Sequence, residues 1–425
     1  MSSEWPRVEV GQLAKLRSGF PFKSADWKVS GVPVIKIANV KAGRISLEGC
    51  GFVSNEVASK SAEWFTRAGD VLITMTGYVG EVAQVKSGER YLINQRVGRF
   101  DFTPNAAVEP KYFFYHLQHP DTRAEIEGVA RGSAQPNLSA GDAHKIKVTL
   151  PPLENQIEIA ATLGALDDRI TLLRETNATL EAIAQALFKS WFVDFDPVRA
   201  KQEGRAPEGM SDATAALFPD ALEETELGPV PKGWRYSTIG ESFILTMGQS
   251  PPGDTYNEAG DGLPFYQGRT DFGFRFPSQR VFCTAPTRLA EPGDTLVSVR
   301  APVGDVNMAL EKCCVGRGVA AVRHPNGCRS FAFYATRGLR SRFDLFDSEG
   351  TVFGSINKKD FQALPVIEPS GDVLVAFDEI AAPIDRRIVG NEEQIRTLAT
   401  LRDTLLPRLI SGQLRVPEAI EATLA

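Results

Sequence analysis

Arg, Lys, Asn, Gln and Ser side chains gather in a few short, loop-like stretches of this chain. A guanidinium or ammonium group can hydrogen-bond to O6 and N7 of guanine, and a carboxamide can pair with adenine in a similar way. Side chains of these types could therefore read nucleic-acid bases. The candidates are Asn94, Gln95 and Arg96; Arg131, Gln135 and Asn137; Arg269, Arg300 and Arg317; and Ser355, Asn357 and Lys358. For each of them, a structural hydrogen bond or a surface salt bridge remains the alternative.

The sequence contains none of the motifs that we would expect of a catalyst. It has no Asn/Asp-Pro-Pro-Tyr/Phe methyltransferase motif, no Gly-x-x-x-x-Gly-Lys-Ser/Thr phosphate loop and no set of zinc ligands. His116 and His119 lie three residues apart without a third ligand in view, so we interpret them as helix-surface or core residues. The acids Asp167 and Asp168 are typical of a solvated helix face. We therefore expect a non-enzyme with no metal and no cofactor.

The composition is that of an ordinary globular protein of two or three domains, with 425 residues that are 43% hydrophobic and 24% charged. No run of about 18 apolar residues is present, and the N-terminus lacks the layout of a signal peptide. The five cysteines form no Cys-x-x-Cys pair, which favours buried free thiols. We expect a cytoplasmic protein that does not bind a membrane.

Charge is distributed in alternating blocks, although the formal net charge is -6. Residues 1–150 hold 19 basic and 15 acidic side chains, and residues 231–367 hold 16 and 13. The segments 151–200, 201–230 and 368–425 are all acidic. Because charge is screened beyond roughly 10 Å at 0.1 M salt, local rather than global positive charge is what a partner with phosphate groups needs. Chance fluctuation of a few charges is the alternative.

The two basic blocks are copies of one another. The matched landmarks are Trp5, Gly11 and Gly19 with Trp234, Gly240 and Gly248; Gly31-Val32-Pro33 with Gly262-Leu263-Pro264; Val79-Gly80-Glu81-Val82 with Val303-Gly304-Asp305-Val306; and Gly132, Leu138 and Asp142 with Gly350, Ile356 and Asp360. A repeat of about two hundred residues is a duplicated domain and not a short-period solenoid. The repeated loop from Gly132 to Leu138 could equally be a required turn.

Each copy begins with short apolar runs bounded by Gly and Pro, such as 32–37 and 294–299, which predict strands. Helices are predicted mainly at 111–119 and 330–339. Each copy then ends in a long helical segment. The first carries a heptad seam at Leu166, Ile170, Leu173, Asn177, Leu180, Ala184, Leu187 and Trp191, and the second at Ile384, Ile388, Asn391, Ile395, Leu398, Arg402, Leu405 and Leu409. We expect Asp196-Pro197 to stop the first helix and Gly412 to cap the second.

The two seams fit each other in one antiparallel register. Pairing Asn177 with Asn391 also aligns Ile170 with Leu398, and Leu173 with Ile395. The sequence therefore predicts an α+β fold of tandem-duplicated mixed α/β domains, each followed by a long helix, with the two helices paired as an antiparallel coiled coil. Two helices that each pack on their own domain are the alternative.

Three longer strings resemble the Type I restriction-modification specificity subunits over essentially the whole chain. Ser190-Trp191-Phe192-Val193-Asp194-Phe195-Asp196-Pro197 is similar to the end of that family's central conserved helix. Leu217-Phe218-Pro219-Asp220, followed by Glu224 to Trp234, resembles the linker into the second target-recognition domain. Leu406-Pro407-Arg408-Leu409-Ile410-Ser411-Gly412-Gln413-Leu414 is similar to the end of the second conserved helix.

The resemblance implies two target-recognition domains that each read half of a split double-stranded DNA site. It also implies paired helices that bind two methyltransferase subunits, which a restriction-translocase subunit can join. We divide the chain into a first target-recognition domain (1–150), a central conserved helix (151–196), a linker (197–230), a second target-recognition domain (231–368), a second conserved helix (369–415) and a tail (416–425). Since the two domains differ in sequence, the DNA site should be asymmetric.

Three other functions remain open at this point. The chain could be the specificity module of a methylation-only system, a free-standing sequence-specific DNA-binding regulator, or a scaffold that binds no DNA. The acidic helices suit protein partners better than phosphates, which argues against the regulator. The first seam spans 25 residue steps, about 38 Å at 1.5 Å per residue, and half-sites one helical turn apart are separated by about 34–36 Å. We therefore expect the helices to set the spacing of the half-sites.

Overall fold

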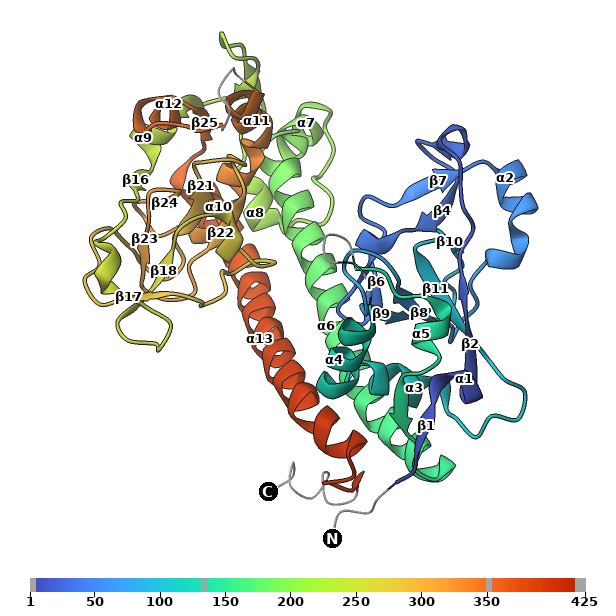
Figure 1. Ribbon diagram of the computed structural model, residues 1–425. Coiled ribbons are helices and arrows are strands. Elements are labelled where there is room, and N and C mark those ends of the chain that lie inside the picture. The colour runs from blue at the N-terminus through green and yellow to red at the C-terminus, as the bar shows by residue number, and fades with distance from the viewer. Residues whose placement is uncertain (1–4, 131, 133–135, 349–353, 417–425) are drawn as a thin grey trace. The chain divides into compact units, whose positions relative to one another are not determined.

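The computed structural model describes residues 5–130, 132, 136–348 and 354–416, which form two compact units (Figure 1). Unit 1 comprises residues up to Leu173 together with those from Gln394, and unit 2 comprises Arg174–Glu393. Two helices of 40 residues, α6 (Leu153–Phe192) and α13 (Gly371–Ile410), each contribute to both units. Each unit therefore contains a segment of both long helices. The domain boundaries that we derived from the sequence stay a prediction.

Unit 1 is built from short strands and short helices ahead of α6. The strands are β1 (Arg7–Glu9), β2 (Ala14–Ser18), β3 (Trp27–Lys28), β4 (Val32–Ile35), β5 (Val40–Lys41), β6 (Arg44–Ile45), β7 (Gly51–Val53), β8 (Val71–Thr74), β9 (Val82–Gln84), β10 (Leu92–Ile93), β11 (Val97–Phe102) and β12 (Lys147–Thr149). The helices are α1 (Val10–Leu13), α2 (Asn55–Lys60), α3 (Pro110–Leu117), α4 (Pro120–Val129) and α5 (Ala140–Ala143).

Unit 2 has the same plan. Its strands are β13 (Leu222–Glu223), β14 (Val230–Pro231), β15 (Arg235–Thr238), β16 (Ile244–Met247), β17 (Tyr256–Asn257), β18 (Leu263–Tyr266), β19 (Phe282–Cys283), β20 (Leu289–Ala290), β21 (Thr295–Ser298), β22 (Val306–Met308), β23 (Cys313–Val315), β24 (Val319–Arg323) and β25 (Pro365–Glu368). Its helices are α7 (Asp196–Gln202), α8 (Asp212–Ala216), α9 (Ile239–Ser242), α10 (Arg329–Gly338), α11 (Arg340–Ser348) and α12 (Lys358–Gln362).

The sheet topology repeats between the units. The antiparallel sheet β2-β11-β8-β9 of unit 1 corresponds to β16-β24-β21-β22 of unit 2. The sheet β10-β4-β7-β3 corresponds to β23-β18-β19-β17, to which unit 2 adds β20 at the edge. In both, the pairing of the first and last strands of the domain, β1 with β12 and β15 with β25, closes the domain just before its long helix. The predicted fold of two duplicated sheet domains, each followed by a long helix, is confirmed.

Two of the matched glycines are explained by close backbone approach. A Cβ atom on Gly19 would lie 2.2 Å from the carbonyl oxygen of Ile93, and one on Gly248 would lie 2.1 Å from that of Gly316. These distances are too short for any side chain. Neighbouring backbone occupies the space of a side chain at this position, so each copy needs glycine here.

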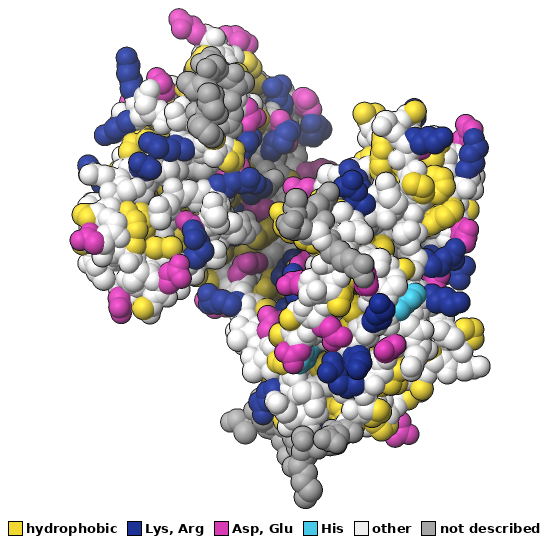
Figure 2. Space-filling view, in the orientation of Figure 1, with side chains coloured by type: hydrophobic (Ala, Val, Ile, Leu, Met, Phe, Trp, Pro, Cys, Tyr) yellow, Lys and Arg dark blue, Asp and Glu magenta, His cyan; other side chains and the backbone are white. Residues whose placement is uncertain are grey.

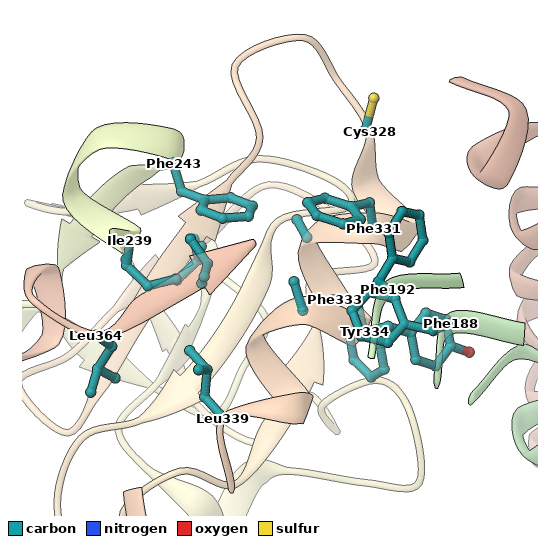
Figure 3. Close-up of a cluster of buried hydrophobic side chains, with 14 of the residues drawn as sticks. Phe188, Phe192, Ile239, Phe243, Cys328, Phe331, Phe333, Tyr334, Leu339 and Leu364 are labelled. Carbon is teal, nitrogen blue, oxygen red and sulfur yellow. The ribbon is translucent and has the colours of Figure 1, made fainter. Parts of the chain in front are cut away.

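Each unit has its own hydrophobic core, which includes both long helices. In unit 1 the aromatic face of α3, with Tyr112 and Phe113, packs with Leu163 of α6 and Leu409 of α13. In unit 2, Phe192 of α6 packs against Phe331 of α10 (Figure 3), and their ring centroids are 5.1 Å apart. Aromatic side chains bury large areas, so these contacts fix each sheet domain on its segments of α6 and α13.

One local prediction was wrong: Asp196-Pro197 does not stop the first long helix. Helix α6 ends at Phe192, and Pro197 instead lies in the first turn of α7. The chain changes direction between the two helices at Phe195, which has a φ of 57° in the left-handed region. Proline is well suited to the first turn of a helix, because its missing N–H has no partner there in any case. At the other end, Gly412 has a φ of 74°, as expected for a residue that follows helix α13.

Candidate nucleic-acid interface

The loop that joins β8 to β9 in unit 1 is built in the same way as the loop that joins β21 to β22 in unit 2. We call residues 75–81, between β8 and β9, hairpin loop 1, and residues 299–305, between β21 and β22, hairpin loop 2. The hydroxyl group of Ser298 donates to the carbonyl oxygen of Pro302 (2.7 Å) and accepts from the N–H of Asp305 (2.9 Å). The Thr74 hydroxyl donates to the Tyr78 carbonyl and accepts from the Glu81 N–H (3.0 Å). One buried hydroxyl therefore closes each loop from inside.

A second loop is bonded to each hairpin loop by two backbone hydrogen bonds. In unit 1, Gly77 N–H donates to Pro136 O (2.9 Å) and Leu138 N–H donates to Met75 O (2.8 Å). The corresponding bonds in unit 2 join Ala301 N to Gly354 O (2.9 Å) and Ile356 N to Val299 O (3.1 Å). The repeated segments 136–138 and 354–356, which we call the second loops, are thus held beside the hairpin loops.

A third segment, the turn before the longest strand of each sheet, completes the arrangement. Met75 N–H donates to Arg96 O (2.9 Å), and Val299 N–H donates to Gly318 O (3.0 Å). The turn 94–96 in unit 1 and the turn 316–318 in unit 2 therefore border the hairpin loops. This backbone scaffold brings the candidates Asn94, Gln95, Arg96 and Asn137 to one site in unit 1. It brings Arg300, Arg317 and Ser355 to the equivalent site in unit 2.

In unit 2, hairpin loop 2, the turn 316–318 and the segment 267–272 line an open hollow of about 710 Å³. Three of the sequence candidates, Arg269, Arg300 and Arg317, contribute to its wall, and all three are exposed. Guanidinium groups on an open surface can bind phosphate oxygens or guanine edges. Figure 2 shows Lys and Arg side chains interspersed with Asp and Glu on the visible face of each unit.

An acidic residue at the end of each hairpin loop pairs with an arginine near the start of the second helix after that loop. Glu81 forms an ion pair with Arg123 of α4. Asp305 pairs with Arg340 of α11 (2.6 Å) and with Arg269 (2.5 Å). The acids match in the sequence repeat, and the paired arginines occupy equivalent turns of their helices. We did not predict these pairs, because they depend on helices that lie far away in the sequence.

Some candidates already have structural partners. The Asn357 side chain caps α12 by accepting from Asp360 N–H (3.0 Å), and Asn94 accepts from Arg96 N–H (3.3 Å). The Asn137 amide oxygen accepts from the Thr76 hydroxyl (2.9 Å). Lys358 is exposed at the start of α12. The candidates Arg131 and Gln135 lie outside the described residues. Arg269 is likewise paired with Asp305. Of the set, Arg300 and Arg317, which are exposed and line the hollow, therefore have the geometry best suited to contact a nucleic acid.

The two asparagines of the coiled-coil register lie against each other within unit 2. Asn391 Nδ2 donates to Asn177 Oδ1 (2.7 Å), and Asn177 Nδ2 donates to Glu392 Oε1 (2.7 Å). In unit 1 the same register places Ile170, Leu173 and Ile395 in one buried cluster. The hydrogen bond between the two buried amides forms only in one alignment, which specifies register at some cost in stability.

We expect the variant carrying N177C and N391C to form a disulfide on mild oxidation, because the two side chains face and touch each other between the helices. Non-reducing electrophoresis after proteolysis between the helices would detect the crosslink. The matched control is the pair T179C and N391C, since Thr179 is exposed on α6. A folded N177C/N391C protein without the crosslink would contradict the register.

A buried ionic cluster in unit 2 was missed by the sequence analysis. Arg275, with no exposed surface, donates to Glu181 of α6 (2.7 Å) and to Asp385 of α13, and its guanidinium lies 3.5 Å from the ring centroid of Phe333. Arg337 also pairs with Glu181. The cluster fixes a loop of the sheet domain to both long helices. The only sequence signal is an arginine between two phenylalanines, at 274 and 276.

The two histidines have structural roles. His116 Nε2 accepts from the N–H of Thr149 in β12 (2.7 Å), and burial lowers the pKa of His116 to about 3. His119 accepts from Asp121 N–H (3.2 Å) at the start of α4. Among the described residues, no group of three His, Cys, Asp or Glu side chains could hold a metal ion. Nor does any helix in this part of the chain have the length and apolar character needed to cross a membrane.

Comparison with known proteins adds independent information. A family model described as the Type I restriction modification DNA specificity domain matches residues 2–182. The chain is 26% identical to the putative type I restriction enzyme MjaX specificity subunit of Methanocaldococcus jannaschii, over 97% of this chain and 94% of that protein. It is also 26% identical to the type I restriction enzyme HindI specificity subunit of Haemophilus influenzae, over 73% and 79% of the two chains.

A solved structure supports the fold. The Type-I restriction-modification system S subunit from M. genitalium aligns with a TM-score of 0.58 at 16% identity, covering 95% of this chain and 96% of that one. At this identity the likeness concerns the fold alone. It extends over both sheet domains and both long helices.

Proposed function

Because the chain belongs to the family of Type I restriction-modification specificity subunits, the non-catalytic DNA-recognition components of those systems, we propose that it selects the DNA target of such a complex. It binds an asymmetric, two-part site in double-stranded DNA. The domain at 1–150 reads one half, and the domain at 231–368 reads the other.

The observation that carries this proposal is the repeated loop site. Both units build the hairpin loop, the second loop and the adjoining turn with equivalent backbone hydrogen bonds. The side chains that this scaffold presents differ: Thr76 and Asn137 in unit 1 correspond to Arg300 and Ser355 in unit 2. A common backbone with different side chains suits two readers of different base sequences.

The long helices supply a matched pair of surfaces for protein partners. Ile157 on α6 and Val375 on α13 occupy equivalent positions of the repeat, and about half of each side chain is exposed. Each has an acidic residue three positions earlier, Glu154 and Asp372. A single exposed aliphatic side chain is ordinary, so it is the repetition of the same pattern in both units that supports two copies of one partner. We assign these surfaces to two methyltransferase subunits, and a restriction-translocase subunit can join the complex.

Replacing one arginine of the hollow tests the reading role. We expect R300A, in the assembled complex, to lose preference at a base of the second half-site, at a cost of about 1–3 kcal/mol per contact, while the first half-site is unchanged. Methylation mapping of cells that carry only the variant would measure this. The control is K312A, because Lys312 is exposed and pairs with Glu291 but does not line the hollow. An unchanged second half-site in R300A would count against Arg300 as a base reader.

A further inference from the structure

The most exposed aromatic side chain among the described residues lies at the centre of hairpin loop 1. Tyr78 is 82% exposed, whereas the other large hydrophobic side chains of its loop, Met75 and Val79, are buried. A tyrosine ring in water gains nothing from burial, so its position here has no explanation in the stability of unit 1. Exposed aromatic residues beside polar readers are typical of binding surfaces.

Hairpin loop 1 holds Tyr78 in place rather than leaving it on a free loop. Its carbonyl oxygen accepts from the buried Thr74 hydroxyl, and Gly77, just before it, is bonded to Pro136. Gly77 and Gly80 on either side have φ values of 76° and 88°, a conformation that glycine adopts without strain. A side chain on a fixed backbone loses little entropy on binding, which favours its use as a contact.

The charge around Tyr78 is compatible with a polyanion. The nearest acid in the loop, Glu81, has its carboxylate engaged by Arg123 and by the N–H of Ala42 (3.2 Å). Its negative charge is therefore balanced within unit 1. Arg96, whose carbonyl oxygen accepts from Met75 N–H, is exposed in the turn beside the loop.

We propose that Tyr78 is a specificity-determining residue that contacts the bases of the first half-site with its aromatic ring. This inference rests on the proposed function and adds a residue that the sequence candidates did not include. An aromatic ring can pack on a thymine methyl group in the major groove, or enter a base step as an apolar wedge. Its counterpart in hairpin loop 2 is Pro302, which lines the hollow with Arg300. Equivalent loop positions thus carry different side chains in the two domains.

The test compares Y78A and Y78F in the full chain assembled with its methyltransferase subunits. We expect Y78A to bind the parental two-part site about tenfold more weakly and to tolerate substitutions at one or more bases of the first half-site. Y78F, which keeps the ring, should behave as the parent. V29A serves as the control, since Val29 is an almost fully exposed apolar side chain of the same unit. Thermal unfolding would verify that each variant is folded.

Two outcomes would overturn the inference. One is a folded Y78A complex with parental affinity and parental base preferences. The other is a loss of affinity that is equal for every DNA sequence, because that result would make Tyr78 a non-specific contact. If the parental complex itself showed no preference for a two-part site, the proposed function would fail. That failure is seen in the parental complex alone, so it is distinguishable from a failure of the role proposed for Tyr78.

Discussion

The variant R275M is expected to lose about 3–5 kcal/mol of the free energy of unfolding, because it removes one partner of a buried ion cluster. Glu181 and Asp385 would remain in the interior of unit 2 without the guanidinium that bridges them. Burial already raises the pKa of Asp385 even with Arg275 present. Without Arg275 the Asp385 carboxylate would bind a proton more readily in the folded state, because the opposite charge that lowers its pKa is removed.

The expected pH dependence follows from that shift. A carboxyl group whose pKa is raised on folding binds more protons in the folded state than in the unfolded state. The free energy of unfolding therefore falls as the pH rises from the pKa of the unfolded chain towards the higher pKa of the folded one. The deficit of R275M relative to the parent should therefore be larger at neutral pH than near pH 4. Chemical denaturation of the full chain, followed by tryptophan fluorescence, would measure it, because the buried Trp191 and Trp234 report on unit 2.

The matched control is R235M. Arg235 forms an exposed pair with Glu368 (2.7 Å) on the edge of the same unit, and such pairs contribute about 0–1 kcal/mol. Equal losses for R275M and R235M would contradict the role that we give to the buried cluster. A deficit of R275M that did not change with pH would contradict its electrostatic origin.

Lengthening both long helices by one heptad is expected to change the target while leaving its bases the same. The design duplicates residues 167–173 in α6 and 395–401 in α13, which are partners in the antiparallel register. The register of Asn177 with Asn391 is preserved on one side of the insertion, and that of Leu166 with Arg402 on the other. Seven residues add about 10.5 Å of helix, close to three base pairs of DNA.

Methylation mapping of cells carrying this variant would report the new target. We expect both half-sites to keep their sequences and the gap between them to widen by about three base pairs. A heptad inserted into α6 alone is the control, because it disrupts the seam and should lower the yield of active complex. If the matched insertion altered the recognised bases and not the gap, the helices would not determine the spacing.

The fold could be predicted from the sequence where the signal was local or periodic. The heptad spacing around Asn177 and Asn391 identified two long helices and their pairing, because apolar residues at fixed intervals define one helix face. The matched landmarks, such as Val79-Gly80-Glu81-Val82 and Val303-Gly304-Asp305-Val306, identified the duplication. The error at Pro197 arose because proline occurs both after the end of a helix and in its first turn. The left-handed conformation of Phe195 separates the two helices here, and phenylalanine gives no indication of that conformation in the sequence.

The candidate site was only partly predictable, because its parts come together through non-local backbone bonds. Arg96 and Asn137 were chosen for their residue types, but only the bonds made by Met75 and Gly77 show that their loops adjoin. Asn357 shows the opposite case, in which a plausible reader caps a helix. Arg275 was missed because the burial of an arginine depends on carboxylates from two helices about a hundred residues away in sequence.

The most direct test of the account is to profile DNA methylation across the host genome with and without this chain. We predict that cells with the chain show methylation at one asymmetric, two-part sequence, and that deletion of the chain abolishes methylation at that sequence while re-expression restores it. Unchanged methylation after deletion, or a target that is palindromic or undivided, would contradict the claim that the two loop sites read two different half-sites.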